Sequence, residues 1–340
     1  MIQSARTALV TGSAGFIGHA VASRLLSEGW KVTGIDAMTD YYDPALKRAR
    51  LSTIAGNPRF THVEARIEEP GRLHHLLSHR PNVVLHLAAQ AGVRHSIDAP
   101  ETYVEANIVG TFRLLEAARA YPPGHLLLAS TSSVYGANTQ MPYAETDKAD
   151  TQMSFYAATK KATEAMAHSY SHLYDLPVTM FRFFTVYGPW GRPDMAPMLF
   201  ADAAFQGRPI RVFNHGDMAR DFTFIDDLVE AIVRLAEAVP SRPKQVGEIA
   251  SADSLSPVAP YRIVNIGNAA PVRLMEFIQA IEAATGRSLA KDMQPMQPGD
   301  VPATWADTRL LEQLTGFRPS TSISDGVARF IDWYRDYFGR

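Results

Sequence analysis

The sequence predicts an α/β fold: a doubly wound parallel sheet, followed in the C-terminal half by a smaller mixed α/β lobe. Three observations lead to this prediction. The chain opens with an apolar run, a glycine-rich turn and an amphipathic segment. Apolar β-type runs then alternate with helical patterns as far as residue 131. The 340 residues exceed the usual length of one domain, about 100–200 residues, so a second lobe is expected.

The first element is a strand over 6–12, RTALVTG, which leads into a turn containing Gly12, Gly15 and Gly18. The residues that follow have helical apolar spacing until Gly29 ends the helix. Glycines let a turn approach a pyrophosphate closely, and the next helix points free N–H groups at it. The spacing is one residue longer at its start than the usual G-x-G-x-x-G. The alternative is a glycine-rich turn that binds nothing.

A second strand, KVTGID over 31–36, ends in Asp36. A carboxylate at this place bonds the diol of a ribose and repels a 2′-phosphate, so it favours NAD over NADP. Together, the glycine turn and Asp36 predict a Rossmann-type sheet with an NAD site.

The remaining strands and helices bring polar residues to one edge of the sheet. Because ligands bind outside the carboxyl ends of parallel strands, Thr131, Ser132 and Ser133 should lie at the mouth of a cleft. Their alternative role is to satisfy the backbone of a turn. Strands are expected at 59–65, 82–89 and 125–131, and helices around 43–55, 70–79 and 100–121.

Tyr156 and Lys160 lie four positions apart in SFYAATKKA, residues 154–162, a stretch without Gly or Pro. The two side chains should therefore share one face of a helix. An adjacent ammonium favours the phenolate and lowers the pKa of a tyrosine. The pair is then a proton-transfer device, or, alternatively, an ordinary pair on a helix surface.

The glycine turn, Thr131 and the Tyr-x-x-x-Lys helix resemble the extended short-chain dehydrogenase/reductase family, over almost the whole chain. The resemblance implies that Tyr156 is the acid/base on a sugar hydroxyl and that Thr131 bonds the same hydroxyl. It implies that Lys160 lowers the pKa of Tyr156 and bonds the nicotinamide ribose. The residues that it places on the NAD side are Gly12, Gly15, Phe16, Ile17, Gly18, Asp36, Ile67, Leu87, Ala88, Ala89, Asn107, Tyr156 and Lys160.

The triplet Thr131-Ser132-Ser133 narrows the implied reaction. Related 4,6-dehydratases carry Thr-Asp-Glu here, and UDP-glucuronate decarboxylases carry Glu at the third place. Without that carboxylate, the resemblance implies 4-epimerisation through a 4-keto intermediate. Three later segments are similar to those of bacterial UDP-glucuronate 4-epimerases: 182–196, 213–232 and 296–308.

The implied activity is therefore NAD-dependent conversion of UDP-glucuronate to UDP-galacturonate. Three alternatives stay open: a 4-epimerase of a neutral UDP-hexose, a UDP-glucuronate decarboxylase and a non-catalytic NAD-binding protein. Of these, the non-catalytic protein has no need of a paired base such as Tyr156 and Lys160.

The substrate side is expected to hold a carboxylate at C6. The 4-keto form of a uronic acid is a β-keto acid, which loses CO2 when its C5–C6 bond aligns with the carbonyl π system. Thr185 stands where galactose-type epimerases carry Asn, and we expect it to hold the carboxylate together with Ser132 and Thr131.

For the UDP end, the resemblance places Arg192 and Arg220 near the uridine and pyrophosphate, and Asp300 on the uridine ribose. It also suggests that Phe213 stacks on uracil. The alternatives are an ion pair of Arg220 with Asp221, a turn cap for Asp300 and a core position for Phe213.

Two positions depart from the family pattern on the NAD side. Arg66-Ile67 stands where relatives carry an Asp followed by Ile or Leu, so only the backbone of Ile67 is expected at the adenine. Ala37 replaces an Asn that commonly follows the acid of the second strand. NAD binding is expected, with its tightness open.

We expect an NAD-binding Rossmann domain over 1–180, including the catalytic helix 154–175, and a UDP-sugar-binding lobe mainly over 181–340. The chain is expected to cross between the two. The family resemblance implies a homodimer paired through 100–121 and 154–175.

Composition excludes several classes of protein. The net charge of -2, without a basic stripe, argues against a nucleic-acid partner. No segment approaches about 18 apolar residues, so we expect no membrane association. The chain has no cysteine, which fits a reducing compartment. With the short apolar run at the N-terminus, this predicts a cytoplasmic protein without a metal site.

Overall fold

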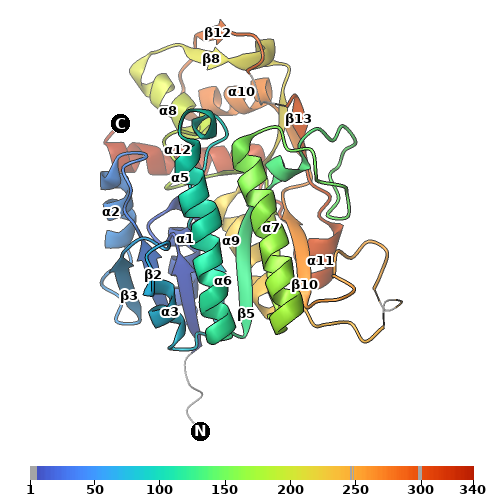
Figure 1. The fold of residues 1–340 in the computed structure, drawn as a ribbon. Helices are drawn as coiled ribbons and strands as arrows, with labels where there is room; N and C mark the ends of the chain where they lie inside the picture. Colours follow the sequence, from blue (N-terminus) through green and yellow to red (C-terminus); the bar gives the residue numbers. More distant parts are fainter. Residues whose placement is uncertain (1–5, 246, 248, 298–300) are drawn as a thin grey trace.

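The structure is a computed structural model that describes residues 6–245, 247, 249–297 and 301–340 (Figure 1). Its centre is a seven-stranded sheet in the order β10-β6-β5-β4-β1-β2-β3, in which every neighbouring pair is parallel. The predicted doubly wound α/β fold is thereby confirmed. The strands are β1 Thr7–Thr11, β2 Lys31–Asp36, β3 Phe60–Glu64, β4 Val83–His86, β5 His125–Thr131, β6 Val178–Phe183 and β10 Tyr261–Ile266.

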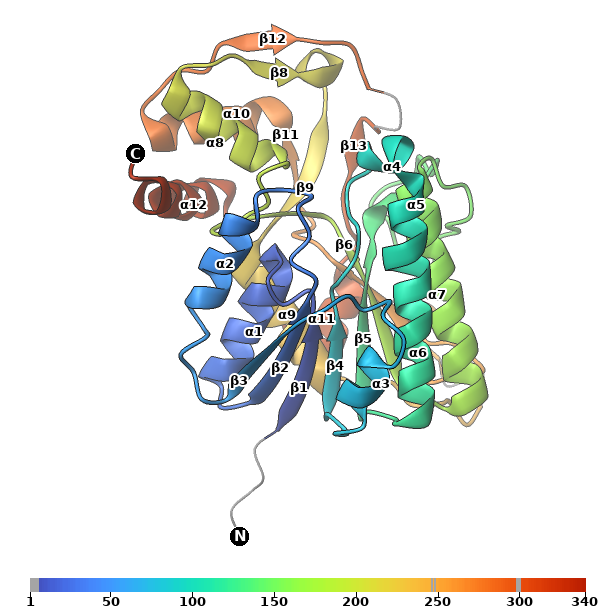
Figure 2. The same ribbon diagram turned by 60° about the vertical axis from the view of Figure 1, so that its left-hand side comes forward.

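Helices cover both faces of this sheet, which explains the apolar composition of its central strands. Every residue of β4 and β6 is buried, as parallel strands between two helical layers require. Figure 2 shows one layer, with α1, α2 and α9, on the opposite side from α3, α6 and α7. The bounds are α1 Phe16–Ser27, α2 Pro44–Ser52, α3 Arg72–Leu77, α6 Gly110–Ala120, α7 Phe155–Tyr174 and α9 Ile225–Glu237.

The strand order reverses between β1 and β4, which creates a crevice at the carboxyl edge of the sheet. Four segments end at this edge: the glycine turn after β1, Asp36 at the end of β2, the chain after β4, and the 3-10 turn η2 (Ser132–Tyr135) after β5. The segments that the sequence predicted to converge after β1, β4 and β5 therefore do lie at one edge of the sheet.

The helix expected around 100–121 is present and runs without a break from residue 100 to residue 120, but its middle is π-helical. It consists of α5 (Pro100–Tyr103), a π-helical stretch η1 (Val104–Val109) and α6. Periodicity alone does not reveal the extra residue of a π turn, because the flanking apolar spacing hardly changes. Such wide turns often lie at functional sites, and this one contains Asn107.

The C-terminal lobe packs on the carboxyl edge and is mixed α/β, as predicted. Its four-stranded sheet is built around β9, which pairs with β7, β11 and β13, and a second small sheet joins β8 to β12. The elements are β7 Thr185–Tyr187, α8 Ala196–Gln206, β8 Ile210–Val212, η3 Phe213–Gly216, β9 Ala219–Phe224, β11 Pro271–Arg273, α10 Leu274–Thr285, β12 Lys291–Met293, β13 Ala303–Thr304 and α12 Ile323–Phe338.

The chain crosses between the two parts several times. After β7 the chain builds α8, β8 and β9 in the lobe, and α9 then returns to pack on α1. β10 adds the last strand to the large sheet, and α11 (Arg309–Thr315) packs on α9 and β10. The division at residue 180 thus falls inside β6, and it stays a prediction. Within the described ranges, no helix is long and apolar enough to span a membrane.

Candidate active site

The turn after β1 approaches neighbouring backbone so closely that only glycine fits. Gly12 has a φ of 74°, and a Cβ on it would lie 2.8 Å from the amide nitrogen of Ala88. A Cβ on Gly18 would lie only 2.0 Å from the carbonyl oxygen of Gly12. These contacts bring the start of α1 tightly against β1 and the chain after β4, as a dinucleotide-binding turn requires.

The first turn of α1 offers unpaired backbone donors. Gly15 is its N-cap without a side-chain cap, and no acidic residue lies in the first turn, which Phe16 and Ile17 begin. The N–H groups there have no acceptor within the helix and lie at the positive end of its dipole. The ring of Phe16 is buried in the core, so its backbone is the part suited to a ligand.

Asp36 is held rigidly at the end of β2. One carboxylate oxygen accepts from the N–H of Ala14 at 3.1 Å, and the other accepts from Met38 at 2.9 Å. The ammonium of Lys47 lies 3.8 Å from the carboxylate. Each oxygen keeps a lone pair for a ribose diol. Together with the glycine turn, these residues fit the adenosine and pyrophosphate of NAD.

The chain after β4 closes the other wall of this crevice. The N–H of Leu87 donates to the carbonyl of Thr11 at 3.2 Å, and the N–H of Ala88 donates to the Thr11 hydroxyl at 3.1 Å. Ala89 follows directly and is half-buried. The predicted residues 87–89 therefore lie against the glycine turn.

Asn107 joins this wall to α7, the helix of Tyr156 and Lys160. Its side-chain oxygen accepts from the N–H of Gln90 at 2.9 Å, and its Nδ2 donates to the hydroxyl of Thr159 in α7 at 3.0 Å. Nδ2 also donates to the carbonyl of Gln90. The side chain is 1% exposed, and these protein contacts position the chain after β4.

Thr131, Tyr156 and Lys160 meet at the same edge. Thr131 ends β5, and Tyr156 and Lys160 lie in the first two turns of α7, which begins at the Ser154 cap. The ammonium of Lys160 donates to the carbonyl of Ala129 at 2.9 Å. Since Ala129 is two residues before Thr131, this bond fixes α7 against β5.

Two groups act against burial on the pKa of Tyr156, and one of them is a cation that the sequence did not indicate for this role. Burial raises the pKa of Tyr156, while the Arg192 guanidinium and the Thr131 hydroxyl act to lower it. Burial also lowers the pKa of Lys160 to about 8, against the opposing effect of Glu164. The Arg192 guanidinium therefore opposes the effect of burial on the pKa of Tyr156, and one N–H of the Lys160 ammonium is bonded to the carbonyl of Ala129.

A buried ion pair lies beneath these groups. Glu164, one helical turn after Lys160, bonds both Nε and Nη2 of Arg182 in β6 at 2.9 Å and accepts from the Ser130 hydroxyl at 2.7 Å. The Glu164 and Arg182 side chains are each 2% exposed. The pair therefore locks α7, β5 and β6 together directly below the candidate catalytic residues.

Ser132 and Thr185 lie on the substrate side of this edge. Both are half-buried, Ser132 in η2 and Thr185 at the start of β7. Thr131 pairs with Phe183 across β5 and β6, so Thr185 follows two residues after the partner of Thr131. Hydroxyls from the η2 turn and from β7 are thus available where a carboxylate of the substrate is expected.

Arg192 is positioned by an acid that the sequence reasoning missed. Asp194 accepts from Nε of Arg192 at 3.1 Å and from a second guanidinium N–H, and it also accepts from the hydroxyl of Tyr41 at 3.1 Å. Tyr41 belongs to the segment after β2, so this contact links the NAD side to the substrate side.

The remaining predicted UDP contacts lie in the lobe. The guanidinium of Arg94 lies 4.6 Å from the centre of the Phe213 ring. Nη1 of Arg220 donates to the carbonyl of Pro302 at 3.1 Å. Phe213 is half-buried, so it is not a core residue. Asp300 lies outside the described residues.

Asp221 has a different role from the ion pair weighed for it. Its carboxylate is fully buried and accepts from the backbone N–H groups of Asn268, Ala269 and Ala306. These bonds hold the loop at 268–269 and the segment at 306 together next to Arg220.

The adenine end shows the departures seen in the sequence. The Arg66 guanidinium is exposed and donates to Glu68 at 3.0 Å. Ile67 is buried, with its side chain close to the backbone of Gly110 at the start of α6. Ala37 follows Asp36 and is half-buried, without a polar side chain.

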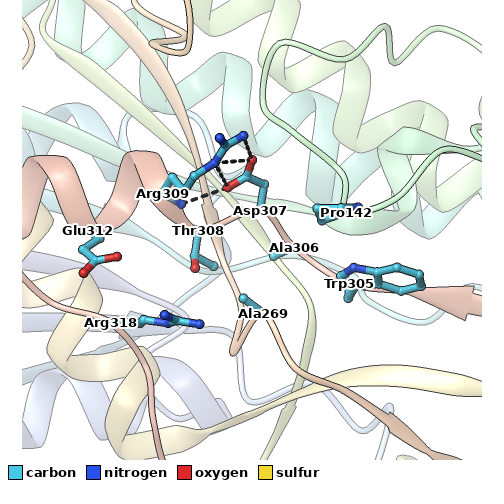
Figure 3. A pocket seen from close by; sticks show the side chains of 9 residues that line it. All are labelled: Pro142, Ala269, Trp305, Ala306, Asp307, Thr308, Arg309, Glu312 and Arg318. Carbon is cyan, nitrogen blue, oxygen red and sulfur yellow. Dashed lines mark hydrogen bonds and ion pairs between the residues drawn. The ribbon is translucent and has the colours of Figure 1, made fainter.

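A hollow of about 280 Å³ lies elsewhere in the molecule, between Pro142, Trp305 and α11 (Figure 3). Arg309 on its wall is engaged by Asp307. None of the residues predicted for the site lines it.

The chain is similar to proteins of known family. The sequence pattern described as "NAD dependent epimerase/dehydratase family" matches residues 8–250, more than half of the chain. A "Probable UDP-glucuronate 4-epimerase" of Rhizobium meliloti (strain 1021) is 54% identical over 333 residues, which are 98% of this chain and 98% of the relative. The chain belongs to the NAD dependent epimerase/dehydratase family.

Solved structures of similar epimerases share the whole fold. The UDP-glucuronic acid 4-epimerase of Bacillus cereus, in complex with UDP-glucuronic acid and NAD, superposes with a TM-score of 0.87 at 32% identity. It covers 97% of this chain and 99% of its own. A UDP-glucose 4-epimerase of Thermotoga maritima, with UDP-glucose, has a TM-score of 0.83 at 25% identity over 98% of this chain and 99% of its own.

Several residues of this family member escaped the sequence reasoning. Tyr41, Arg94 and Asp194 gain their importance only through contacts with distant segments. Tyr103 donates to the carbonyls of residues 91 and 92, and its ring lies 6.0 Å from that of Tyr156. The one usable signal was the cluster of polar aromatic residues in 40–43, directly after the predicted NAD-binding strand.

Proposed function

We propose that this protein is an NAD-dependent UDP-glucuronate 4-epimerase, which converts UDP-glucuronate to UDP-galacturonate. One observation carries the proposal. Thr131, Tyr156 and Lys160 lie together beside the crevice whose residues fit NAD. Serines occupy positions 132 and 133, where related sugar-modifying enzymes carry acids. The names of the relatives at 54% and 32% identity support the same reading.

The chemistry asked of the protein is a proton transfer at the C4 hydroxyl. Tyr156 takes the proton from O4 and later returns it, and the cation of Arg192 supports its phenolate. Thr131 orients the same hydroxyl. The glycine turn and Asp36 would hold NAD, which would supply reversible hydride transfer at C4, so that the C4 ketone could be reduced again from its other face. Lys160, fixed by Ala129, holds the nicotinamide ribose.

Retention of the carboxylate is the second requirement. Ser132 and Ser133 offer no carboxylate that assists loss of C6 or removes a C5 proton. Hydroxyls of Ser132 and Thr185 hold the C6 carboxylate, so that the C5–C6 bond stays out of line with the carbonyl π system. Arg220 binds the diphosphate, Phe213 stacks on uracil and Asp300 bonds the uridine ribose.

The test is incubation of the purified protein with UDP-glucuronate and NAD, without added reductant, followed by separation of the nucleotide sugars. We expect UDP-galacturonate, with no UDP-xylose and no accumulated NADH. Tyr156→Phe should reduce turnover by about 10²–10⁴-fold while NAD binding persists. Tyr174→Phe, at the far end of the same helix, is the matched control and should stay active.

Each alternative has its own outcome. UDP-xylose as the main product would indicate a decarboxylase, and conversion of UDP-glucose alone would indicate an epimerase of neutral hexoses. NAD binding without conversion of any UDP-sugar would leave a non-catalytic protein. Full activity in Tyr156→Phe would refute the mechanism.

We further propose a cytoplasmic homodimer that pairs through α6 and α7. Phe112, Phe155, Leu173 and Tyr174 on these helices are each at least 39% exposed, and a dimer that pairs through both helices would cover apolar side chains of this kind. The absence of cysteine fits the reducing cytoplasm. Light scattering should give twice the chain mass, and Leu173→Glu should shift it to the monomer. Cell fractionation tests the location.

A further inference from the structure

Arg50 in α2 is a buried cation whose partners are all neutral. It is 0% exposed, and all five of its N–H groups donate to backbone carbonyls or to a phenol. Across the described part of the chain, no carboxylate lies within ion-pair distance of its guanidinium, although the charge of Asp36 is felt there. Burial of a charge without a paired counter-ion destabilises the folded protein. The segments that Arg50 connects therefore indicate what the residue does.

The five bonds reach three separate segments. Nη1 donates to the carbonyl of Ala14 in the glycine turn at 3.1 Å and to the hydroxyl of Tyr42 at 2.7 Å. Nε and Nη2 donate to the carbonyl of Trp190 at 3.1 and 2.7 Å, and Nη2 also reaches that of Gly191 at 3.1 Å. One planar guanidinium therefore connects the NAD turn with the loop just before Arg192.

That loop needs such support. Trp190 has a φ of 65°, a conformation that a bulky residue adopts only when its surroundings hold it there. Arg192 and Asp194 follow directly, and Asp194 binds Tyr41, the neighbour of Tyr42. The NAD side and the substrate loop are thus joined twice.

We propose that Arg50 is a positioning residue that couples occupation of the NAD turn to the arrangement of the 190–194 loop, and hence to binding of the UDP-sugar. The inference rests on the proposed function. A dinucleotide held by the glycine turn would bring its negative diphosphate towards the Arg50 guanidinium, which bonds Ala14 in that turn. Among the described residues, Asp36 is the carboxylate whose charge reaches Arg50. Binding of the dinucleotide would stabilise the charged form of the Arg50 guanidinium. Because the same planar group also bonds the 190–194 loop, the loop would become better ordered at the same time.

The test measures coupling instead of turnover. The dissociation constant of NAD is determined by titration calorimetry on nucleotide-free protein, with and without saturating UDP. In the unchanged protein we expect UDP to tighten NAD binding by about 5-fold or more, the lower range of couplings between sites. Linkage requires NAD to tighten UDP binding by the same factor.

Two substitutions separate charge from geometry. Arg50→Lys keeps the charge but cannot form the five-bond fork, so the coupling should fall to less than about 2-fold while NAD affinity changes less. Arg50→Met loses the charge, so NAD affinity itself should fall. Arg48→Lys, exposed on the same helix, is the matched control and should keep the coupling.

Several results would contradict the proposed role of Arg50. Unchanged coupling in Arg50→Lys overturns it, as does wild-type protein that binds both ligands independently. If neither Arg50 variant folds, Tyr42→Phe, which deletes a single bond at a half-buried residue, should weaken the coupling; an unchanged ratio there refutes the proposal. A wild-type protein that binds neither ligand refutes the proposed function instead.

Discussion

The two sides of the cleft are held in different ways. On the NAD side, Gly12 and Asp36 are fixed by hydrogen bonds with nearby backbone: the N–H of Gly12 donates to the carbonyl of Ile35 at 2.7 Å, and the Asp36 carboxylate accepts from two backbone N–H groups at 2.9 and 3.1 Å. On the substrate side, Arg192 and Phe213 are half-buried and are positioned by other side chains, Asp194 and Arg94. Backbone hydrogen bonds thus hold the NAD side in place, whereas the substrate side is positioned by side chains on loops from different parts of the chain. Substitutions around the NAD crevice should therefore cause large losses of unfolding free energy. Substitutions in the C-terminal lobe should cause smaller changes, mainly in the affinity for the UDP part of the substrate.

The largest effect is expected in the layer that both sides share. Glu164→Gln leaves the buried Arg182 without its counter-ion, and breaking a buried pair this way costs about 3–5 kcal/mol of unfolding free energy. Urea unfolding measures it. Glu69→Gln, which removes an exposed partner of Arg72, is the control and should cause no measurable change. Equal stability of the two variants would show that the Glu164 pair does not support the site.

The NAD side should respond to a single methyl group. A Cβ in Gly18→Ala would collide with the Gly12 carbonyl at 2.0 Å, and such overpacking costs about 1–3 kcal/mol. We expect weaker NAD binding and a lower unfolding midpoint. Gly56→Ala meets nothing within 4 Å and serves as the matched control. Unchanged NAD affinity in Gly18→Ala would remove the distinction between the two sides.

The pH dependence probes the junction of the two sides. Burial lowers the pKa of Lys160 to about 8, so its charge is lost as the pH rises above that value, and activity should fall on this alkaline limb. The unfolded chain keeps the proton up to about 10.4, so Lys160 should make the unfolding free energy rise with pH between these two values.

Lys160→Arg tests the assignment, because arginine stays charged throughout this range. Its activity should be lower, with the alkaline limb near pH 8 removed from the profile of kcat/KM. The same limb in Lys160→Arg would assign it to another group. Its unfolding free energy should also lose the rise with pH above 8.

The smallest effect is expected in the lobe. Phe213→Ala removes the ring beneath Arg94, and loss of base stacking costs about 1–3 kcal/mol of binding free energy. The Kd of UDP should rise accordingly, while NAD affinity and the unfolding midpoint stay unchanged. Val239→Ala, exposed just after α9 and outside the proposed dimer interface, is the control for loss of an exposed apolar side chain. A fall in stability as large as that of Gly18→Ala would contradict the comparison.

The sequence by itself determined the parts that depend on local periodicity and on glycine. The strands around the glycine turn, the position of Asp36 and the shared helix face of Tyr156 and Lys160 could all be predicted, because 2.0- and 3.6-residue periods and a missing Cβ are properties of short segments. The parallel order of the sheet follows from the alternation of strands and helices.

Only the tertiary structure decided which charges meet. Arg192 acts on Tyr156 from 36 positions away, Glu164 meets Arg182 across two elements, and Arg50 reaches the loop at 190. Such contacts depend on how loops of different strands pack at one edge, and no local spacing encodes a distance between residues that are far apart in the chain. The reacting residues could therefore be named from sequence, while the groups that set their charge and position could not.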